Sequence, residues 1–96
     1  MKKHVGLSQI VQAKPHIISR KEKNCYLLVN RENGAVLVVN DLGIEIWNTV
    51  KEKIKVTDII EKLMKKYGVK FEDSKRETTK FVEELLRNEL LAVSGF

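Results

Sequence analysis

The sequence predicts a single α+β domain in which antiparallel strands are followed by helices, and three observations lead to this prediction. The dipeptide Asn33-Gly34, a strong turn signal, separates two apolar segments rich in strand-forming residues. The second segment ends near Asn40, where the spacing of apolar residues changes from that of a strand to that of a helix. A chain of 96 residues can bury one hydrophobic core.

The N-terminal third contains the predicted strands. Residues 7–13 form a short first strand, which Pro15 ends because proline cannot donate a ladder hydrogen bond. The lysine-rich residues 16–24 indicate a loop or a weak strand. Residues 25–30 form the second strand, and residues 35–39, an unbroken apolar run, form the third.

A two-residue loop at Asn33-Gly34 would fix the register of this hairpin. It would pair Arg31 with Val36, Val29 with Val38, and Leu28 with Val39. Alternation then gives two apolar faces, one with Cys25, Leu27, Val29, Val36 and Val38, the other with Tyr26, Leu28, Leu37 and Val39. Helices can cover only one face, so the N-terminal segment, a second subunit or a ligand should cover the other.

Three helices are predicted after the hairpin. The first spans residues 41–51, with Asn40 as its N-cap and Asp41 where the helix dipole favours an acid. Thr57 is the expected cap of a second helix over residues 58–67, which Gly68 ends. Its apolar stripe consists of Ile59, Ile60, Leu63, Met64 and Tyr67.

The third helix should begin with a capping box formed by Ser74 and Glu77. Phe81, Val82, Leu85 and Leu86 follow at helical spacing, and Asn88 is a plausible terminator. We expect the apolar residues 90–93 to fold back onto the core.

Composition indicates a cytoplasmic protein. The sequence has no signal peptide and no apolar run near the roughly 18 residues of a membrane span. Cys25 is the only cysteine, so an intramolecular disulfide is impossible and a reducing compartment is expected.

The net charge of +5 is unevenly distributed. Residues 1–40 carry +5, residues 41–50 carry −2, residues 51–70 carry +4 and residues 71–96 carry −2. The basic character therefore lies in the N-terminal third and around the second helix, whereas the third helix is net acidic.

No catalytic or metal site is predicted. His4 and His16 are the only histidines and lie in terminal or loop-like segments, which with one cysteine leaves no credible zinc ligand set. Cys25 opens an apolar strand and is interpreted as a small buried hydrophobe rather than a nucleophile. Gly34 and Gly43 are isolated, so no phosphate-binding loop is present. We therefore expect a binding module without a cofactor, not an enzyme.

The third strand raises the question of what it binds. Natural edge strands are protected by charge, proline or bulges, and residues 35–39 contain none of these protecting residues. The strand is therefore either paired within the protein or open to receive a strand from a ligand. The pattern alone leaves both alternatives open.

Residues 14–93 resemble the PqqD-like family of peptide-recognition domains. The matching features, in order, are Pro15, Leu27-Leu28, Asn33-Gly34, Val39-Asn40, Gly43, Ile46-Trp47, Thr57-Asp58-Ile59-Ile60, Tyr67, Phe81-Val82, Leu85 and Leu90-Leu91. Asn88-Glu89 departs from the family, which often has a glycine before the final Leu-Leu. The resemblance implies a winged-helix-like fold, a three-stranded antiparallel sheet followed by three helices. Residues 1–13 would be an N-terminal segment with the first strand, and residues 14–96 the recognition domain.

The resemblance also implies a function. Such domains bind the leader segment of a ribosomally made precursor peptide and present it to a radical adenosylmethionine enzyme, a leader peptidase or a cyclase. The leader adds as a strand to the third strand, in the groove against the third helix. Carried onto this chain, the expected peptide-binding residues are Val36, Leu37, Val38, Val39, Lys80, Phe81, Glu84 and Leu85. We expect a free-standing subunit.

Two alternatives compete with this hypothesis. The order of elements also suits a winged-helix DNA-binding protein, but a third helix with net charge −2 would be repelled by phosphates, so we expect no nucleic-acid partner. A structural role as a homodimeric enzyme subunit would use the apolar hairpin face, and it is compatible with peptide binding. No membrane contact is expected.

Overall fold

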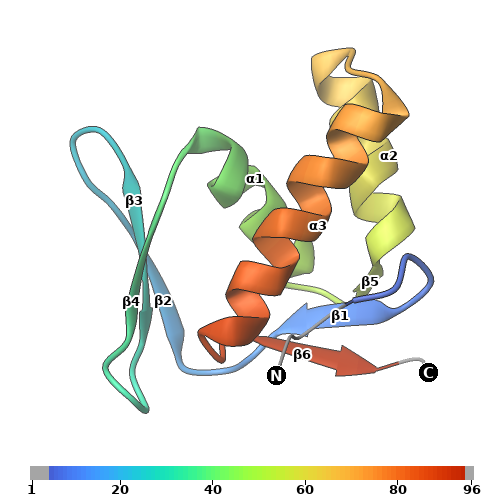
Figure 1. Cartoon of the computed structure of the whole chain (residues 1–96). Helices are drawn as coiled ribbons and strands as arrows, with labels where there is room; N and C mark the ends of the chain where they lie inside the picture. Colours follow the sequence, from blue (N-terminus) through green and yellow to red (C-terminus); the bar gives the residue numbers. More distant parts are fainter. Residues whose placement is uncertain (1–4, 95–96) are drawn as a thin grey trace.

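The computed structural model describes residues 5–94, which form two small antiparallel sheets and three helices (Figure 1). The first sheet, here called the hairpin sheet, has the order β2-β3-β4, with β2 at Ile17–Lys21, β3 at Tyr26–Asn30 and β4 at Val36–Val39. The second, the terminal sheet, has the order β5-β1-β6, with β1 at Ile10–Ala13, β5 at Ile54–Lys55 and β6 at Leu91–Ser94.

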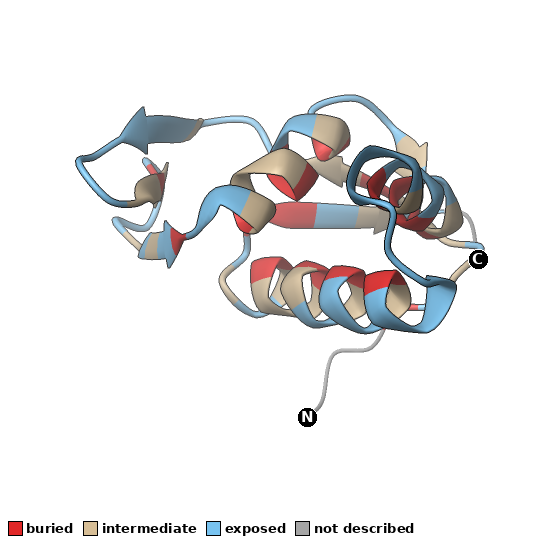
Figure 2. Ribbon diagram, turned by 90° about the horizontal axis from the view of Figure 1, so that it is seen from above, coloured by how far each residue is buried: buried red, intermediate tan, exposed pale blue. Residues whose placement is uncertain are grey.

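The helices are α1 at Asp41–Val50, α2 at Val56–Tyr67 and α3 at Phe71–Arg87. The hairpin sheet lies to one side of them, and the terminal sheet crosses below (Figure 1). The core lies where the helices meet the inner faces of both sheets, and its fully buried side chains include Val11, Leu28, Ile46, Ile59 and Leu85. Buried residues accordingly follow the inner sides of the helices (Figure 2).

The predicted three-stranded sheet followed by three helices is therefore confirmed, but its first strand was misassigned. The hairpin is completed by β2, from the segment expected to be a loop or weak strand, and not by β1. β1 instead pairs with β5 and β6, and its paired residues lie 43 or more positions away in the sequence. Such long-range pairing leaves no local signal in the sequence. The predicted apolar tail is β6, and Leu90 and Leu91 are buried in the core as expected.

The predicted faces of the hairpin are confirmed, whereas its register was wrong by two residues. Val29 lies opposite Val36, Leu27 opposite Val38, and Tyr26 opposite Val39. A type I′ turn needs positive φ at both central residues, and in this loop only Gly34 has it, at 75°. The loop is longer because the side chain of Asn30 accepts a hydrogen bond from the Glu32 N–H at 2.9 Å. A shift of two residues leaves every side chain on its predicted face.

Three of the predicted helix ends are confirmed, and each depends on residues close in the sequence. Asn40 caps α1 as predicted, since its Oδ1 accepts a hydrogen bond from the Gly43 N–H at 2.8 Å. Gly68 ends α2 in the left-handed conformation, with φ of 63°, also as predicted. Asn88 ends α3, with its side chain donating to the Glu84 carbonyl at 2.8 Å.

Two predicted N-caps were wrong. α2 begins at Val56, and the N–H groups of Val56 and Thr57 donate to Gln9 and Leu7 carbonyls at 3.0 Å, so the backbone before β1 replaces a side-chain cap. α3 begins at Phe71, and Ser74 lies within it. The Ser74 hydroxyl is buried and donates to the Ile60 carbonyl at 2.8 Å, which joins α3 to α2. Both differences come from contacts with distant segments.

One ion pair joins the first two helices on the surface. Lys66 Nζ lies 2.7 Å from a carboxylate oxygen of Glu45. The hydrogen bond to Glu45 raises the pKa of Lys66 above its usual value of 10.5. Because both side chains are partly solvated, this ion pair contributes little to the stability of the fold.

Candidate functional site

A groove lies between the end of β4, the first turns of α1 and one face of α3. Its volume is about 180 Å³. It is lined by Val38, Val39, Asn40, Leu42, Gly43, Ile46, Glu77, Lys80, Phe81 and Glu84. β4, α1 and α3 therefore meet near Asn40, at the predicted junction between strand and helix. The hollow lined by these residues is called the groove below.

One wall of the groove is the open edge of β4. The Asn30 N–H donates to the Ala35 carbonyl at 2.9 Å, which identifies these two residues as a hydrogen-bonded pair. Such pairs alternate along an antiparallel ladder, so Leu37 and Val39 also bond to β3, whereas the N–H and C=O groups of Val36 and Val38 point away from it. Within residues 5–94, no strand pairs with that side of β4. The edge therefore presents unpaired backbone donors and acceptors.

The opposite wall is a single face of α3. Glu77, Lys80, Phe81 and Glu84 follow the i, i+3, i+4, i+7 spacing that brings side chains onto one side of a helix. The ring of Phe81 is half-buried and packs against the core, while Lys80 is exposed. The wall thus offers an apolar surface with charges of both signs beside it.

The base of the groove depends on the absence of a side chain at Gly43. A Cβ atom there would lie 3.0 Å from Cε1 of Phe81 and 3.1 Å from Cβ of Val39. Both distances are shorter than nine in ten contacts of Cβ atoms in proteins, so a neighbouring side chain would have to shift. Glycine therefore lets the first turn of α1 approach both walls closely, and it leaves the Phe81 ring in place.

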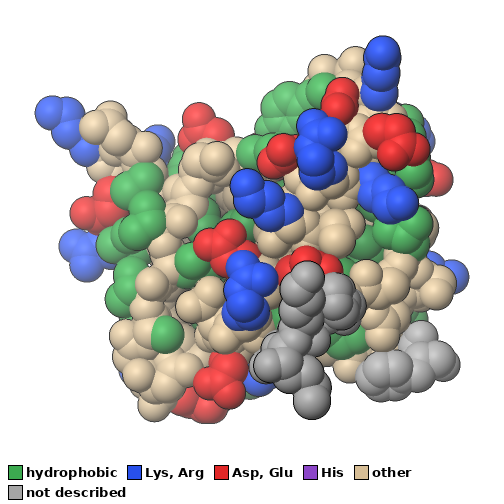
Figure 3. All heavy atoms as spheres, in the orientation of Figure 1, with side chains coloured by type: hydrophobic (Ala, Val, Ile, Leu, Met, Phe, Trp, Pro, Cys, Tyr) green, Lys and Arg blue, Asp and Glu red, His purple; other side chains and the backbone are tan. Residues whose placement is uncertain are grey.

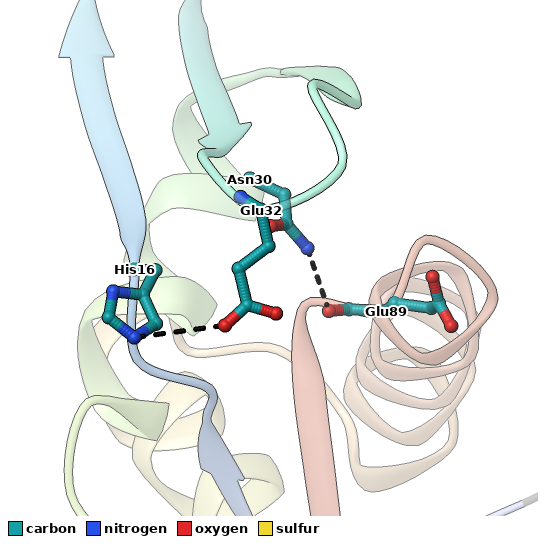
Figure 4. A network of polar contacts seen from close by, with 4 residues as sticks. All are labelled: His16, Asn30, Glu32 and Glu89. Atoms are coloured by element: carbon teal, nitrogen blue, oxygen red, sulfur yellow. Dashed lines mark hydrogen bonds and ion pairs between the residues drawn. The ribbon is translucent and has the colours of Figure 1, made fainter.

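A polar network holds the hairpin against the end of α3 (Figure 4). The buried Asn30 donates through Nδ2 to the carbonyl of Glu89 at 3.2 Å, while Asn33 donates to the Glu89 carboxylate at 3.2 Å. His16 lies just before β2, and its Nε2 is 3.7 Å from the carboxylate of Glu32 in the loop after β3. Glu89 itself has a positive φ of 59°, so the chain turns sharply there to present its carbonyl. The network ties β3 and the loop before β4 to the helix that forms the other wall.

The structure brings together most of the residues predicted from the sequence. The groove contains Val38, Val39, Lys80, Phe81 and Glu84. Val36 and Leu37 precede it on the same strand, with Val36 at the open edge and Leu37 half-buried on the inner face. Leu85 is fully buried in the core, with 0% of its surface exposed. Its position one turn after Phe81 suits it to support that ring from behind.

Sequence reasoning missed half of the groove, namely Asn40, Leu42, Gly43, Ile46 and Glu77. Helical spacing from Glu84 back to Glu77 could have identified the latter, but Glu77 had been assigned to a capping box. The sequence predicts Asn40 as a helix cap, and Gly43 and Ile46 as matches to the family motif. No pattern within the sequence shows that α1 and α3 approach each other.

The described residues contain no candidate metal site and a single cysteine. Among residues 5–94, no group of three or more His, Cys, Asp and Glu side chains could hold a metal ion. Cys25 is half-buried at the start of β3 and has no partner sulfur. No helix within this range is long and apolar enough to cross a membrane.

Comparison with known proteins identifies the family and the fold of the chain. Residues 25–91 match the family model described as Coenzyme PQQ synthesis protein D (PqqD). A search of curated proteins finds no significant match. The fold is similar to that of TbiB1 in complex with the TbiA(beta) leader peptide, with a TM-score of 0.72 and 19% identity over 88% of this chain and 96% of that one.

A second solved structure is similar to the same extent. Lasso peptide synthetase B1, complexed with the leader peptide, has a TM-score of 0.72 and 20% identity over 85% of this chain and 96% of that one. At such identity the two structures establish a shared fold. Because the family model covers well over half of the sequence, the chain belongs to the PqqD family.

Proposed function

We propose that this protein is a non-catalytic module that captures the leader segment of a ribosomally made precursor peptide and presents it to a modifying enzyme or a leader peptidase. The observation that carries the proposal is the open edge of β4 beside a groove whose other wall is α3. Membership of the PqqD family and the leader peptides bound by both structural neighbours support it.

In this proposal the leader adds as a strand to β4. The N–H and C=O groups of Val36 and Val38 form the new ladder, because they are the backbone groups directed to the open edge. Each ladder bond contributes a net stabilisation of about 0.5–1.5 kcal/mol. That gain must exceed the ordering cost of a disordered leader, so side-chain contacts are needed as well.

The side chains of the groove supply these contacts and the selectivity. Phe81 and Val39 form the apolar surface for leader side chains, with Leu85 supporting Phe81 from the core and Leu37 anchoring β4 on its inner face. Lys80 and Glu84 select charged leader residues at the rim, and they fix the register of the added strand.

The decisive experiment replaces Val38 by proline. Val38→Pro removes an N–H that points to the open edge, so the ladder with β3 stays intact and the fold should survive. We expect at least a tenfold loss of affinity for leader peptides encoded by short reading frames beside this protein's gene, measured by fluorescence polarisation.

Two further variants control this test. Val38→Ala keeps the N–H and should bind the peptide far better than Val38→Pro. Lys62→Ala, on the exposed side of α2, should bind like the parent protein. Circular dichroism must show that Val38→Pro is folded, and unchanged affinity in that folded variant would refute strand addition to β4.

The proposal also covers the extent of the domain, its location in the cell and its enzyme partner. The recognition domain spans residues 14–96, and the protein acts in the cytoplasm, where precursor peptides are made. Its enzyme partner is a radical adenosylmethionine enzyme, a peptidase or a cyclase. The lysines on α2, which include Lys62, Lys65 and Lys66, offer a basic surface away from the groove for such a partner.

One observation also favours self-association. The outer face of the hairpin sheet is apolar, and Ile18, Val36 and Val38 are 46%, 54% and 64% exposed. Hydrophobic side chains gather over this sheet in Figure 3. We propose that a second copy of the chain covers this face in the absence of peptide, as a homodimer.

A further inference from the structure

A second hollow, here called the apolar pocket, lies at the end of the groove. Its volume is about 360 Å³, twice that of the groove. Leu42 of α1, Leu63 and Tyr67 of α2, and Val69 of the α2–α3 connection form its walls. Leu63 belongs to the buried core, whereas Tyr67 and Val69 remain 46% and 39% exposed. The apolar stripe of α2 is therefore left uncovered at its C-terminal end.

The apolar pocket is continuous with the groove, because Leu42 and Glu77 line both. β4 runs directly into α1 through Asn40, so a strand paired with β4 would reach Leu42 as it passes Val39. The peptide residues just beyond that end of the added strand are thus the ones that enter the pocket. This placement holds for either direction of the added strand.

The rim of the apolar pocket is acidic, although the whole chain carries a net charge of +5. Asp41, Asp73 and Glu77 supply three carboxylates. Two cations lie near them among the described residues: Arg76 contacts Asp73 at 3.0 Å and Glu77 at 3.9 Å, and Lys66 Nζ lies 5.7 Å from the centre of the Tyr67 ring. Figure 3 shows acidic, basic and hydrophobic side chains close together near the α2–α3 connection.

Helix dipoles explain only part of this acidity. Asp41 and Asp73 lie in the first turns of α1 and α3, where a carboxylate is favourable by itself. Glu77 lies one turn further along α3, where the dipole offers little. The excess of carboxylates favours a positively charged occupant.

We infer that the apolar pocket is a second specificity site of the peptide groove, which takes a large apolar side chain next to a lysine or arginine of the bound peptide. The inference rests on the proposed function for the identity of the occupant as a peptide. The pocket itself can be tested without any peptide.

The test uses three small probes with the same indole ring, namely cationic tryptamine, neutral 3-methylindole and anionic indole-3-acetate. Each is titrated into ¹⁵N-labelled protein at low salt, and amide shifts are followed by NMR. We expect saturable shifts at Leu63, Tyr67 and Val69. Tryptamine should bind about two- to fivefold more tightly than 3-methylindole, the effect of a solvent-exposed charge pair, and 0.5 M NaCl should remove this preference.

Matched variants assign the effect to the pocket. Tyr67→Ala should weaken all three probes, whereas Phe71→Ala, which removes a similarly exposed ring outside the pocket, should not. Asp73→Asn should remove the preference for tryptamine, whereas Asp58→Asn, in the corresponding first turn of α2, should keep it. No saturable shift at these residues would overturn the site, and equal binding of the three probes would overturn its preference for positive charge.

Val38→Pro separates this inference from the proposed function. The variant should bind tryptamine like the parent protein while it loses the leader peptide. If leader binding depends on Val38 but tryptamine does not bind, strand addition stands and the pocket inference fails. If tryptamine binds but no leader peptide shifts Tyr67 and Val69, a peptide is not the occupant of the pocket.

Discussion

Single residues set the shape of the groove, and Gly43 shows this most directly. Its missing side chain allows α1, β4 and α3 to meet, as the 3.0 Å approach of a hypothetical Cβ to Phe81 indicates. The turn signal at Asn33-Gly34 is visible in the sequence, but the requirement at Gly43 is not, because it depends on two residues from other elements.

We predict that Gly43→Ala destabilises the protein by about 1–3 kcal/mol, since overpacking outweighs the better helix propensity of alanine. The measurement is the free energy of unfolding in urea. The double variant Gly43→Ala/Phe81→Leu should recover part of this loss, because leucine leaves space for the new methyl group. The predicted clash would be contradicted if the double variant lost as much free energy of unfolding as the two single variants together, or more.

At the scale of elements, the hairpin sheet and α3 must stay at a fixed separation for the groove to exist. The buried Asn30 links them, because its side chain donates a hydrogen bond to the Glu89 carbonyl. The same side chain accepts a hydrogen bond from the Glu32 N–H in the loop before β4. A second, solvent-exposed hydrogen bond joins the same two parts, from the Asn33 side chain to the Glu89 carboxylate.

We predict that Asn30→Ala costs about 1–3 kcal/mol of stability, because it removes the hydrogen bonds that a buried side chain makes to the Glu89 carbonyl and the Glu32 N–H. Asn33→Ala is the control. The hydrogen bond from Asn33 to Glu89 is solvent-exposed, so Asn33→Ala should lower the free energy of unfolding by less than Asn30→Ala does. Hydrogen exchange should show faster opening of β3 and β4 amides in Asn30→Ala. Equal stability of the two variants would show that the link does not hold the hairpin.

At the scale of the whole molecule, the hairpin sheet has two surfaces to which we assign proposed roles, its β4 edge and its outer face. Ile18 lies on the outer face but on β2, away from β4. We predict that Ile18→Lys abolishes a concentration-dependent dimer in sedimentation velocity experiments and leaves leader affinity unchanged. Ser19→Lys, on the adjacent residue with the opposite orientation, should dimerise like the parent. A parent protein that is monomeric at all concentrations would exclude the homodimer.

The charge distribution gives a second prediction at this scale. α3 carries five acidic and four basic side chains, so the helix that a winged-helix protein would place in the major groove does not attract phosphates. We expect no retention of a random DNA duplex at 50 mM salt in a mobility-shift assay. Retention that falls steeply with added salt would favour the nucleic-acid alternative instead.

The sequence by itself determined the features that depend on neighbouring residues. Alternation fixed the two faces of the hairpin, and the Asn40 cap and Gly68 terminator fixed one end of α1 and one end of α2. The ordered motifs fixed the family, and with it the sheet followed by three helices. These features rely on backbone and side-chain hydrogen bonds within a few residues, so they appear as local patterns.

Only the tertiary structure decided which strands pair and which residues line the groove. β1 joins β5 and β6 because backbone groups from distant segments satisfy one another, and the carbonyls just before β1 replace the cap predicted at Thr57. Ser74 lies inside α3, where its hydroxyl bonds to the Ile60 carbonyl of α2. The groove needs β4, α1 and α3 at one place, and Gly43 has its role only once Phe81 lies against it. Contacts between segments far apart in the chain leave no periodic signal, so this part of the site had to be seen in three dimensions.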